Sequence, residues 1–271
     1  MKKFGLLSAF RLGFLICSAL TAVWQTLAVL FSYQPNDHYF KSGDFLSIAA
    51  VVFAIMGAAY GIIGVLADKK KNDYPNILAR ATFPNPMAGG AVAATLLFAG
   101  YRMLSAGYGA KFSRFDLLLT VTLALTAVYA VLCGIQNAAG RKTLTALFGL
   151  FAIVALILLN AYYYFDRSIE MNAPLKTSIQ VGLLFATLFL TGEVRYLLGS
   201  EMPRMMQIFA VCTIAFGALS AVAIPVAFFG GMLNRPDYLA GALLVLGFVP
   251  TALIRLHTLT AKPKTAPEKT E

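Results

Sequence analysis

Long apolar runs with few charges recur from one end of this chain to the other. An α-helix rises about 1.5 Å per residue, so about 20 apolar residues cross the hydrocarbon core of a bilayer. We therefore expect an all-α fold, a polytopic bundle of eight transmembrane helices with no soluble domain. The expected spans are residues 9–33, 44–67, 87–104, 115–139, 143–165, 175–199, 204–230 and 237–257, with a disordered cytoplasmic tail over 260–271.

The composition supports a membrane protein. The chain is 59% hydrophobic and 13% charged, whereas an ordinary soluble domain is about 45–50% apolar and about 25% charged. A soluble chain of 271 residues would need much more polar surface. The composition therefore indicates a multi-pass integral membrane protein.

The formal net charge of +10 is explained by the short loops between apolar runs, which hold most of the basic residues. With eight spans, most of the 22 Lys and Arg residues fall on the side that also holds both termini. The positive-inside rule then predicts cytoplasmic N- and C-termini. We expect anionic lipid headgroups, and not nucleic acid, to be the partners of these loops. Short loops and the lack of glycosylation sequons favour a bacterial inner or plasma membrane.

Sequence motifs for catalysis are missing. The chain has no HExxH, P-loop, GxSxG or Rossmann fingerprint. Its three cysteines lie singly in apolar runs, and its two histidines, His38 and His257, are expected on opposite sides of the membrane. The sequence therefore predicts no catalytic residue, no metal and no cofactor, and it disfavours an enzyme.

Glu193 is the only acidic residue well inside an apolar run. A carboxylate at that depth costs a few kcal/mol unless it is paired. We expect Arg11 or Arg255 to be its partner, because Arg195 points off the other side of the same helix. An ion pair that orders the bundle and a group that binds or gates a ligand are both open interpretations.

Polar side chains form further stripes on the first and fourth runs. Together with the sixth run, these stripes are expected to line a cavity that opens on the cytoplasmic side. The candidate ligand or gating residues are Glu193, Arg195, Arg11, Gln136, Asn137, Arg255, Thr122, Thr126, Tyr129 and Gln25.

The second run carries a stripe of small residues, which includes Gly57, Gly61 and Gly64. Small residues let helix backbones approach closely in lipid. This face is therefore expected to pack against another helix and not to form a binding site.

Two local signals concern span ends and kinks. Tyr162, Tyr163 and Tyr164 end the fifth run and are typical of an interfacial aromatic belt. Pro225 and Pro250 lie inside the last two runs, where each lacks an N–H and leaves a carbonyl free one turn earlier. A kink is therefore expected at Pro225.

These features leave alternative functions. The polar stripes favour a transporter-like or small-ligand or lipid-binding membrane module with a polar-lined cavity. The small-residue face and the basic stretch from Lys69 to Lys71 suit a structural or regulatory subunit that contacts a partner membrane protein. A lipid-modifying membrane enzyme is the least favoured alternative, because no titratable groups cluster at membrane depth.

Overall fold

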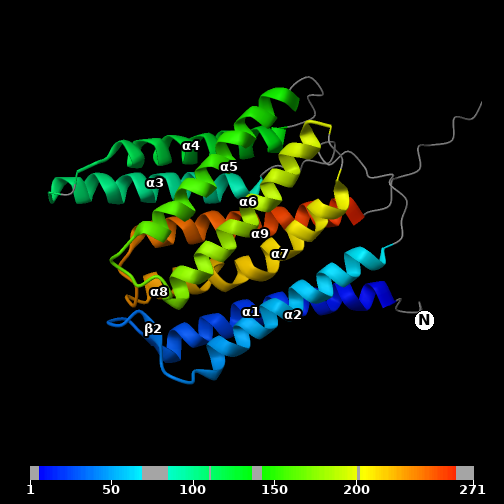
Figure 1. The fold of residues 1–271 in the computed structure, drawn as a ribbon, viewed down its shortest axis with the longest axis horizontal. Coiled ribbons are helices and arrows are strands. Elements are labelled where there is room, and N and C mark those ends of the chain that lie inside the picture. The colour runs from blue at the N-terminus through cyan, green and yellow to red at the C-terminus, as the bar shows by residue number, and fades with distance from the viewer. Residues whose placement is uncertain (1–5, 69–84, 110, 136–141, 200–201, 261–271) are drawn as a thin grey trace, which may run out of the picture.

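The computed structural model confirms the all-α membrane bundle (Figure 1). It describes residues 6–68, 85–109, 111–135, 142–199 and 202–260. Eight of its helical segments are long and apolar enough to cross a membrane. The predicted tail beyond Thr260 and the basic stretch from Lys69 to Lys71 lie outside the described residues. The helices are α1 (Leu6–Ser32), α2 (Phe45–Ala67), α3 (Pro86–Gly107), α4 (Arg114–Ile135), α5 (Lys142–Phe165), α6 (Pro174–Leu197), α7 (Pro203–Ala221), α8 (Ala223–Phe229) and α9 (Pro236–Thr260).

Four of these helices begin with proline, at Pro86, Pro174, Pro203 and Pro236. Proline suits the first helical turn, because an N–H there has no acceptor within the helix. These prolines explain why the described starts fall within one residue of the predicted ones.

The seventh predicted span is divided into α7 and α8 at Val222. Pro225 provides the reason, because its ring clashes with the carbonyl four residues earlier, that of Ala221. The predicted kink is therefore confirmed. In contrast, α9 continues through Pro250, and Thr251 donates a hydrogen bond to the carbonyl of Gly247.

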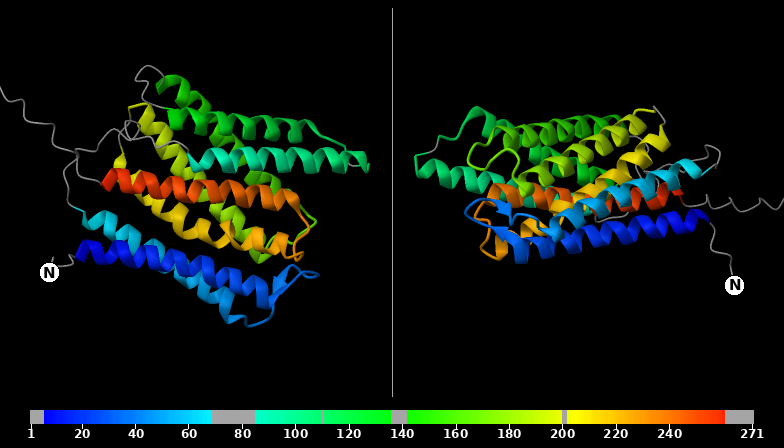
Figure 2. Two further views of the ribbon diagram at one scale, coloured as in Figure 1. Left: turned by 180° about the vertical axis from the view of Figure 1, so that it is seen from behind. Right: turned by 60° about the horizontal axis from the view of Figure 1, so that its bottom comes forward.

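The helices form three groups (Figures 1 and 2). α1 and α2 pair along one flank, and α3 and α4 lie on the opposite flank. α7 and α9 lie between these flanks, and α6 packs on both α5 and α7. α1 begins and α9 ends at the same end of the bundle, which we call the terminal end; the other is the distal end.

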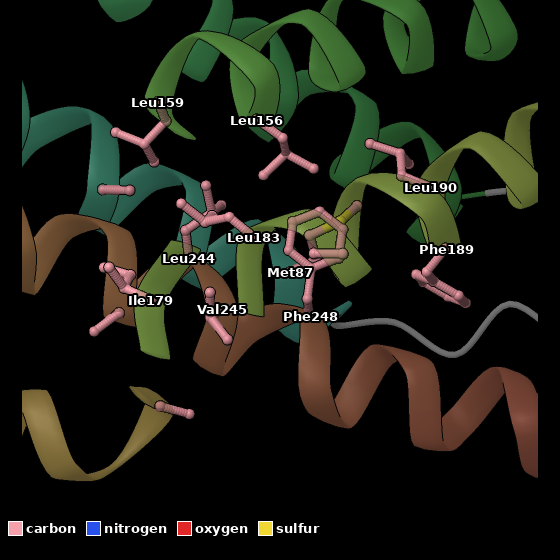
Figure 3. Packing of buried hydrophobic residues seen from close by; sticks show 14 of the residues in the cluster. Met87, Leu156, Leu159, Ile179, Leu183, Phe189, Leu190, Leu244, Val245 and Phe248 are labelled. Atoms are coloured by element: carbon pink, nitrogen blue, oxygen red, sulfur yellow. The ribbon is translucent and has the colours of Figure 1, made fainter. Parts of the chain in front are cut away.

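The main apolar core extends across the bundle from α1 to α9, and Figure 3 shows the part of it around Leu156, Leu183 and Phe248. Close backbone contact between α3 and α9 supports this core. A Cβ on Gly90 would lie 2.6 Å from the carbonyl oxygen of Leu243, which only glycine avoids.

α3 begins beside the middle of α9, where Pro86 lies next to Gly247. Asn85 caps α3 by accepting from the backbone N–H of Met87 (3.1 Å), and it accepts a second bond from the Thr251 hydroxyl (3.0 Å). The Asn85 amide also donates to the carbonyl of Ala130 on α4 (3.3 Å). The cap is thus satisfied although Asn85 is buried. As a result, the turn between α3 and α4 extends beyond the other distal turns (Figure 1).

A short antiparallel ribbon follows α1, with β1 (Tyr33–Gln34) paired to β2 (Tyr39–Phe40). The Tyr39 hydroxyl donates to Glu170 (2.7 Å) and contacts Asn172, both in the α5–α6 connection. This contact ties the α1–α2 flank to the rest of the distal end.

Candidate functional site

Glu193 on α6 forms a buried ion pair with Arg255 on α9. The Nε of Arg255 donates to Oε1 of Glu193 at 2.7 Å, and the two residues are only 2% and 4% exposed. Of the two arginines predicted as partners of Glu193, Arg255 is therefore the one that binds it. Arg11 instead pairs with Asp68 at 3.2 Å.

Tyr129 brings α4 to the same cluster. Its ring is fully buried beside Gly149 of α5 and Val194 of α6, and it interacts electrostatically with Glu193 and Arg255. The buried Cys133 thiol interacts with the Tyr129 hydroxyl in this cluster, and Oε2 of Glu193 is buried without a hydrogen-bond partner among the described residues.

The remaining α4 candidates do not offer free polar groups. The Thr122 hydroxyl donates to the carbonyls of Leu118 and Leu119, and the Thr126 hydroxyl donates to that of Thr122. Such bonds within one helix satisfy a hydroxyl where no water is present. Gln136 and Asn137 lie outside the described residues.

Arg195 is exposed on α6, and Gln25 is buried on α1. The α1 and α4 stripes do not face a common space, because α1 packs on α2, α7 and α8, whereas α4 packs on α3 and α5. The expected cavity between the first, fourth and sixth spans is therefore not formed by the described helices. The sequence could not give the order of helices around the bundle.

A pocket of about 180 Å³ instead lies at the terminal end between α1, α2, α7 and α9. Of the predicted candidates, it includes Arg11 and the packing residues Gly61 and Gly64. Its polar residues are Arg11, Asp68, Gln207 and His257, which all lie near the terminal ends of their helices. Its apolar walls are made by Phe14, Leu15, Tyr60, Val65, Val211, Leu253 and Leu256.

Among the polar residues of this pocket, Gln207 is the most informative about a ligand. Its side chain is only 5% exposed, lines the pocket and makes no hydrogen bond with any described residue. Its amide is not among the fully buried polar atoms that lack a partner, so a ligand in the pocket can form hydrogen bonds with it. Gln207 was not among the residues predicted from the sequence, although this polar residue lies one turn into an apolar run.

The three glycines of α2 lie where helices approach most closely. The positions of a Cβ on Gly57 and Gly64 are within 3.5 Å of α1 side chains, and a Cβ on Gly61 would lie 2.4 Å from Cγ1 of Val211 on α7. The small-residue face is thus occupied within the chain.

A second polar cluster at the distal end was not anticipated. Arg235 donates through Nη2 to Asp166 (2.8 Å) and to Asp237 (2.6 Å), and it also contacts Ser168. Asp237 is fully buried and accepts from the Tyr162 hydroxyl (2.8 Å). We call these five residues the distal clamp. It connects the end of α5, the α5–α6 connection and the start of α9.

The distal clamp pairs the carboxylates of Asp166 and Asp237 with the single guanidinium of Arg235. Burial alone would raise the pKa of Asp166, but hydrogen bonds from Ser168 and the charge of Arg235 outweigh it and lower that pKa below its usual value. Burial would lower the pKa of Arg235, but its hydrogen bonds and attraction to Asp237 raise it above the ordinary value. The clamp is therefore a satisfied structural network and not an empty binding site.

The tyrosines of the fifth run form part of this network. Tyr163 is fully buried and donates to the backbone carbonyl of Asp237 (2.6 Å), Tyr162 is half-buried, and Tyr164 is exposed. Of the three tyrosines, only Tyr164 is therefore exposed, and its place in an interfacial belt stays a prediction. The sequence did contain a signal for this cluster, because Arg235 and Asp237 lie on either side of Pro236, the proline that begins α9.

Chemically, neither cluster resembles a catalytic centre. Within the described parts of the chain, no three His, Cys, Asp or Glu side chains gather as a metal site would require. The pocket at the terminal end offers apolar walls, one unpartnered amide and one exposed ion pair. These features are suited to binding.

Comparison of the chain with protein-family models, with curated proteins and with solved structures found no match. The eight apolar helices nevertheless define its class, a multi-pass integral membrane protein.

Proposed function

We propose that this protein is a membrane module that binds an amphiphile, a molecule with a polar headgroup and an apolar chain. The observation that supports the proposal is the pocket at the terminal end, in which the unpartnered amide of Gln207 lies above apolar walls. Ligand sites in proteins are typically apolar with a few placed polar groups.

The arrangement of the pocket matches the two parts of an amphiphile. The polar groups of Arg11, Gln207 and His257 lie near the terminal end, and the apolar residues Phe14, Val211 and Leu253 lie deeper along their helices. A headgroup would therefore contact the polar end while its chain extends toward the middle of the membrane.

The pocket volume limits what is enclosed. A cavity of about 150 Å³ is enough for one benzene molecule, so about 180 Å³ accommodates part of one chain and not a whole two-chain lipid. We propose a single-chain amphiphile, or one chain of a larger lipid. The headgroup class that fits carries hydrogen-bond acceptors, because the Gln207 amide and the Arg11 guanidinium are donors at the polar end of the pocket.

The alternative of a subunit that docks through its small-residue face receives less support. That face packs on α1 and α7 within the chain, so it is not available to a partner protein. The basic stretch at Lys69 to Lys71 is still a predicted contact for lipid headgroups or for a partner.

Photo-crosslinking tests the proposal. A single-chain phospholipid with a diazirine in its acyl chain should label peptides from α1, α7 and α9 in the folded protein. Leu256→Trp fills the pocket and should abolish this labelling, whereas the same change at Leu96, which is 68% exposed on α3, should leave it intact. Equal labelling of the two variants, at equal thermal stability, would contradict the proposal.

A further inference from the structure

A second pocket, of about 440 Å³, lies beside α8 in the distal half of the bundle. We call it the distal pocket, and the pocket that holds Gln207 the terminal pocket. The lining of the distal pocket comes from α1, the α7–α8 break and α9, and it is apolar throughout. Leu30, Val222 and Leu246 in this lining are 44%, 40% and 39% exposed. The distal pocket therefore opens on the outer surface of the bundle, which faces lipid in a membrane-spanning chain.

The two pockets lie on the same face of the helices that they share. Residues separated by whole helical turns of 3.6 residues lie on one face. On α9, Leu246 of the distal pocket and His257 of the terminal pocket are 11 residues apart, which is close to three turns. Val211 at the terminal pocket and Val222 at the distal pocket, where α7 ends, have the same separation.

The surface between the two pockets is suited to an apolar chain. Seen from behind, α7 passes between α9 and α1 (Figure 2, left), and it packs on both. Ala19 and Ala22 on α1 and Val249 and Pro250 on α9 lie between the levels of the two pockets, and all four are at least partly exposed. The hydroxyl of Thr26, on the same side of α1, is satisfied by the carbonyl of Ala22 at 2.7 Å.

The separation of the pockets matches the length of a lipid chain. The hydrocarbon core of a bilayer is about 30 Å thick and holds two chains end to end, so one chain covers about 15 Å. The 11 residues from His257 to Leu246 correspond to about 16 Å along α9. A chain whose headgroup lies beside His257 thus reaches the distal pocket at Leu246.

We propose that the chain of the bound amphiphile leaves the terminal pocket, follows the face between α1 and α9, and ends in the distal pocket. The protein is then specific for amphiphiles with a long chain, because a short chain ends before Leu246. This inference rests on the proposed function and adds the chain-length class of its ligand.

Photo-crosslinking with two probes locates the ends of the chain. Both probes are palmitoyl lysophospholipids, one with a diazirine near the headgroup and one with a diazirine at the chain end. The first should label peptides around Val211 and Leu253, and the second should label peptides around Val222 and Leu246. If the first labels as expected and the second does not reach the distal pocket, the chain-length inference is wrong. If neither labels the bundle at these positions, the proposed function itself fails.

Chain length gives an independent test by affinity. Leu246→Trp fills the mouth of the distal pocket and should weaken binding of a palmitoyl lysophospholipid about tenfold, the effect of two methylene groups left unburied. Binding of the octanoyl compound with the same headgroup, whose chain is half as long, should not change. Leu96→Trp on α3 is the control and should bind both compounds as the wild type does. Equal losses for the two compounds in Leu246→Trp, or no loss for either, would overturn the inference.

Discussion

At the scale of single residues, three buried acidic side chains of this protein each form an ion pair with an arginine. Glu193 pairs with Arg255, Asp116 pairs with Arg102 through two bonds of 2.9 Å, and Asp237 pairs with Arg235. A buried charge that loses its partner costs about 3–5 kcal/mol, whereas the removal of both charges is often nearly neutral.

The Glu193–Arg255 pair should therefore show strong non-additivity. We expect Glu193→Met and Arg255→Met each to lower the free energy of unfolding by about 3–5 kcal/mol, because each removes the oppositely charged partner of a buried charge. The double variant should be more stable than either single variant. Thermal unfolding in detergent measures all three, and additive losses would show that the pair does not act as an isolated buried pair.

The distal clamp predicts a dependence of stability on pH. The pKa of Asp166 is lowered in the folded state, so its contribution to stability is complete above its unfolded pKa of about 3.9 and is lost as the pH falls through the lower folded value. Asp166→Asn should reduce stability at pH 7 by about 1–3 kcal/mol. Its thermal midpoint should also fall less steeply than that of the wild type below about pH 4.

Asp37 provides the control for this measurement, because it is exposed in the turn between β1 and β2. Asp37→Asn should follow the wild-type pH profile. If Asp166→Asn follows that profile too, Asp166 does not contribute through its charge.

At the scale of helices, the close approach of α2 to its neighbours depends on glycine. A Cβ on Gly61 would lie 2.4 Å from Val211, so Gly61→Ala should lower stability by about 1–3 kcal/mol through overpacking. Val211→Ala in the same chain makes room and should restore part of the loss. Gly100→Ala on α3 is the control, since no atom lies within 4 Å of its added Cβ, and unfolding curves that show equal effects at Gly61 and Gly100 would contradict this account of the contact.

The number of helices and most of their ends could be predicted from the sequence, because apolar length and proline position act locally. Pro225 gave the α7–α8 break for the same reason. The start of α3 within the bundle could not be predicted, since it depends on Asn85 meeting Thr251 and Ala130 from distant parts of the chain.

The site was predictable only where one residue was unusual in its own run. Glu193 met that condition, and Arg255 was one of its two suggested partners. The pocket and the distal clamp depend instead on which helices are neighbours. The pocket brings Arg11 of α1 close to Gln207 of α7, and the clamp brings Asp166 close to Asp237 of α9. A pattern within one helix contains no information about that order.

At the scale of the whole molecule, the two ends of the bundle differ. The distal end holds the clamp and the contact of Tyr39 with the α5–α6 connection, and its pocket of about 440 Å³ beside α8 is lined by apolar residues alone. The terminal end holds the pocket, where the polar groups are the Arg11–Asp68 ion pair, the Gln207 amide and His257. This asymmetry supports a ligand that enters from the terminal end or from the adjacent lipid.

Native mass spectrometry of the protein, extracted gently from its own membrane, tests this account most directly. We predict one bound amphiphile per chain in the wild type and in Leu96→Trp, and none in Leu256→Trp. Gln207→Leu should retain less of it, because the chain still fits while the headgroup loses its amide partner. A wild type without any bound amphiphile, or equal retention in Leu256→Trp, would contradict the proposed function.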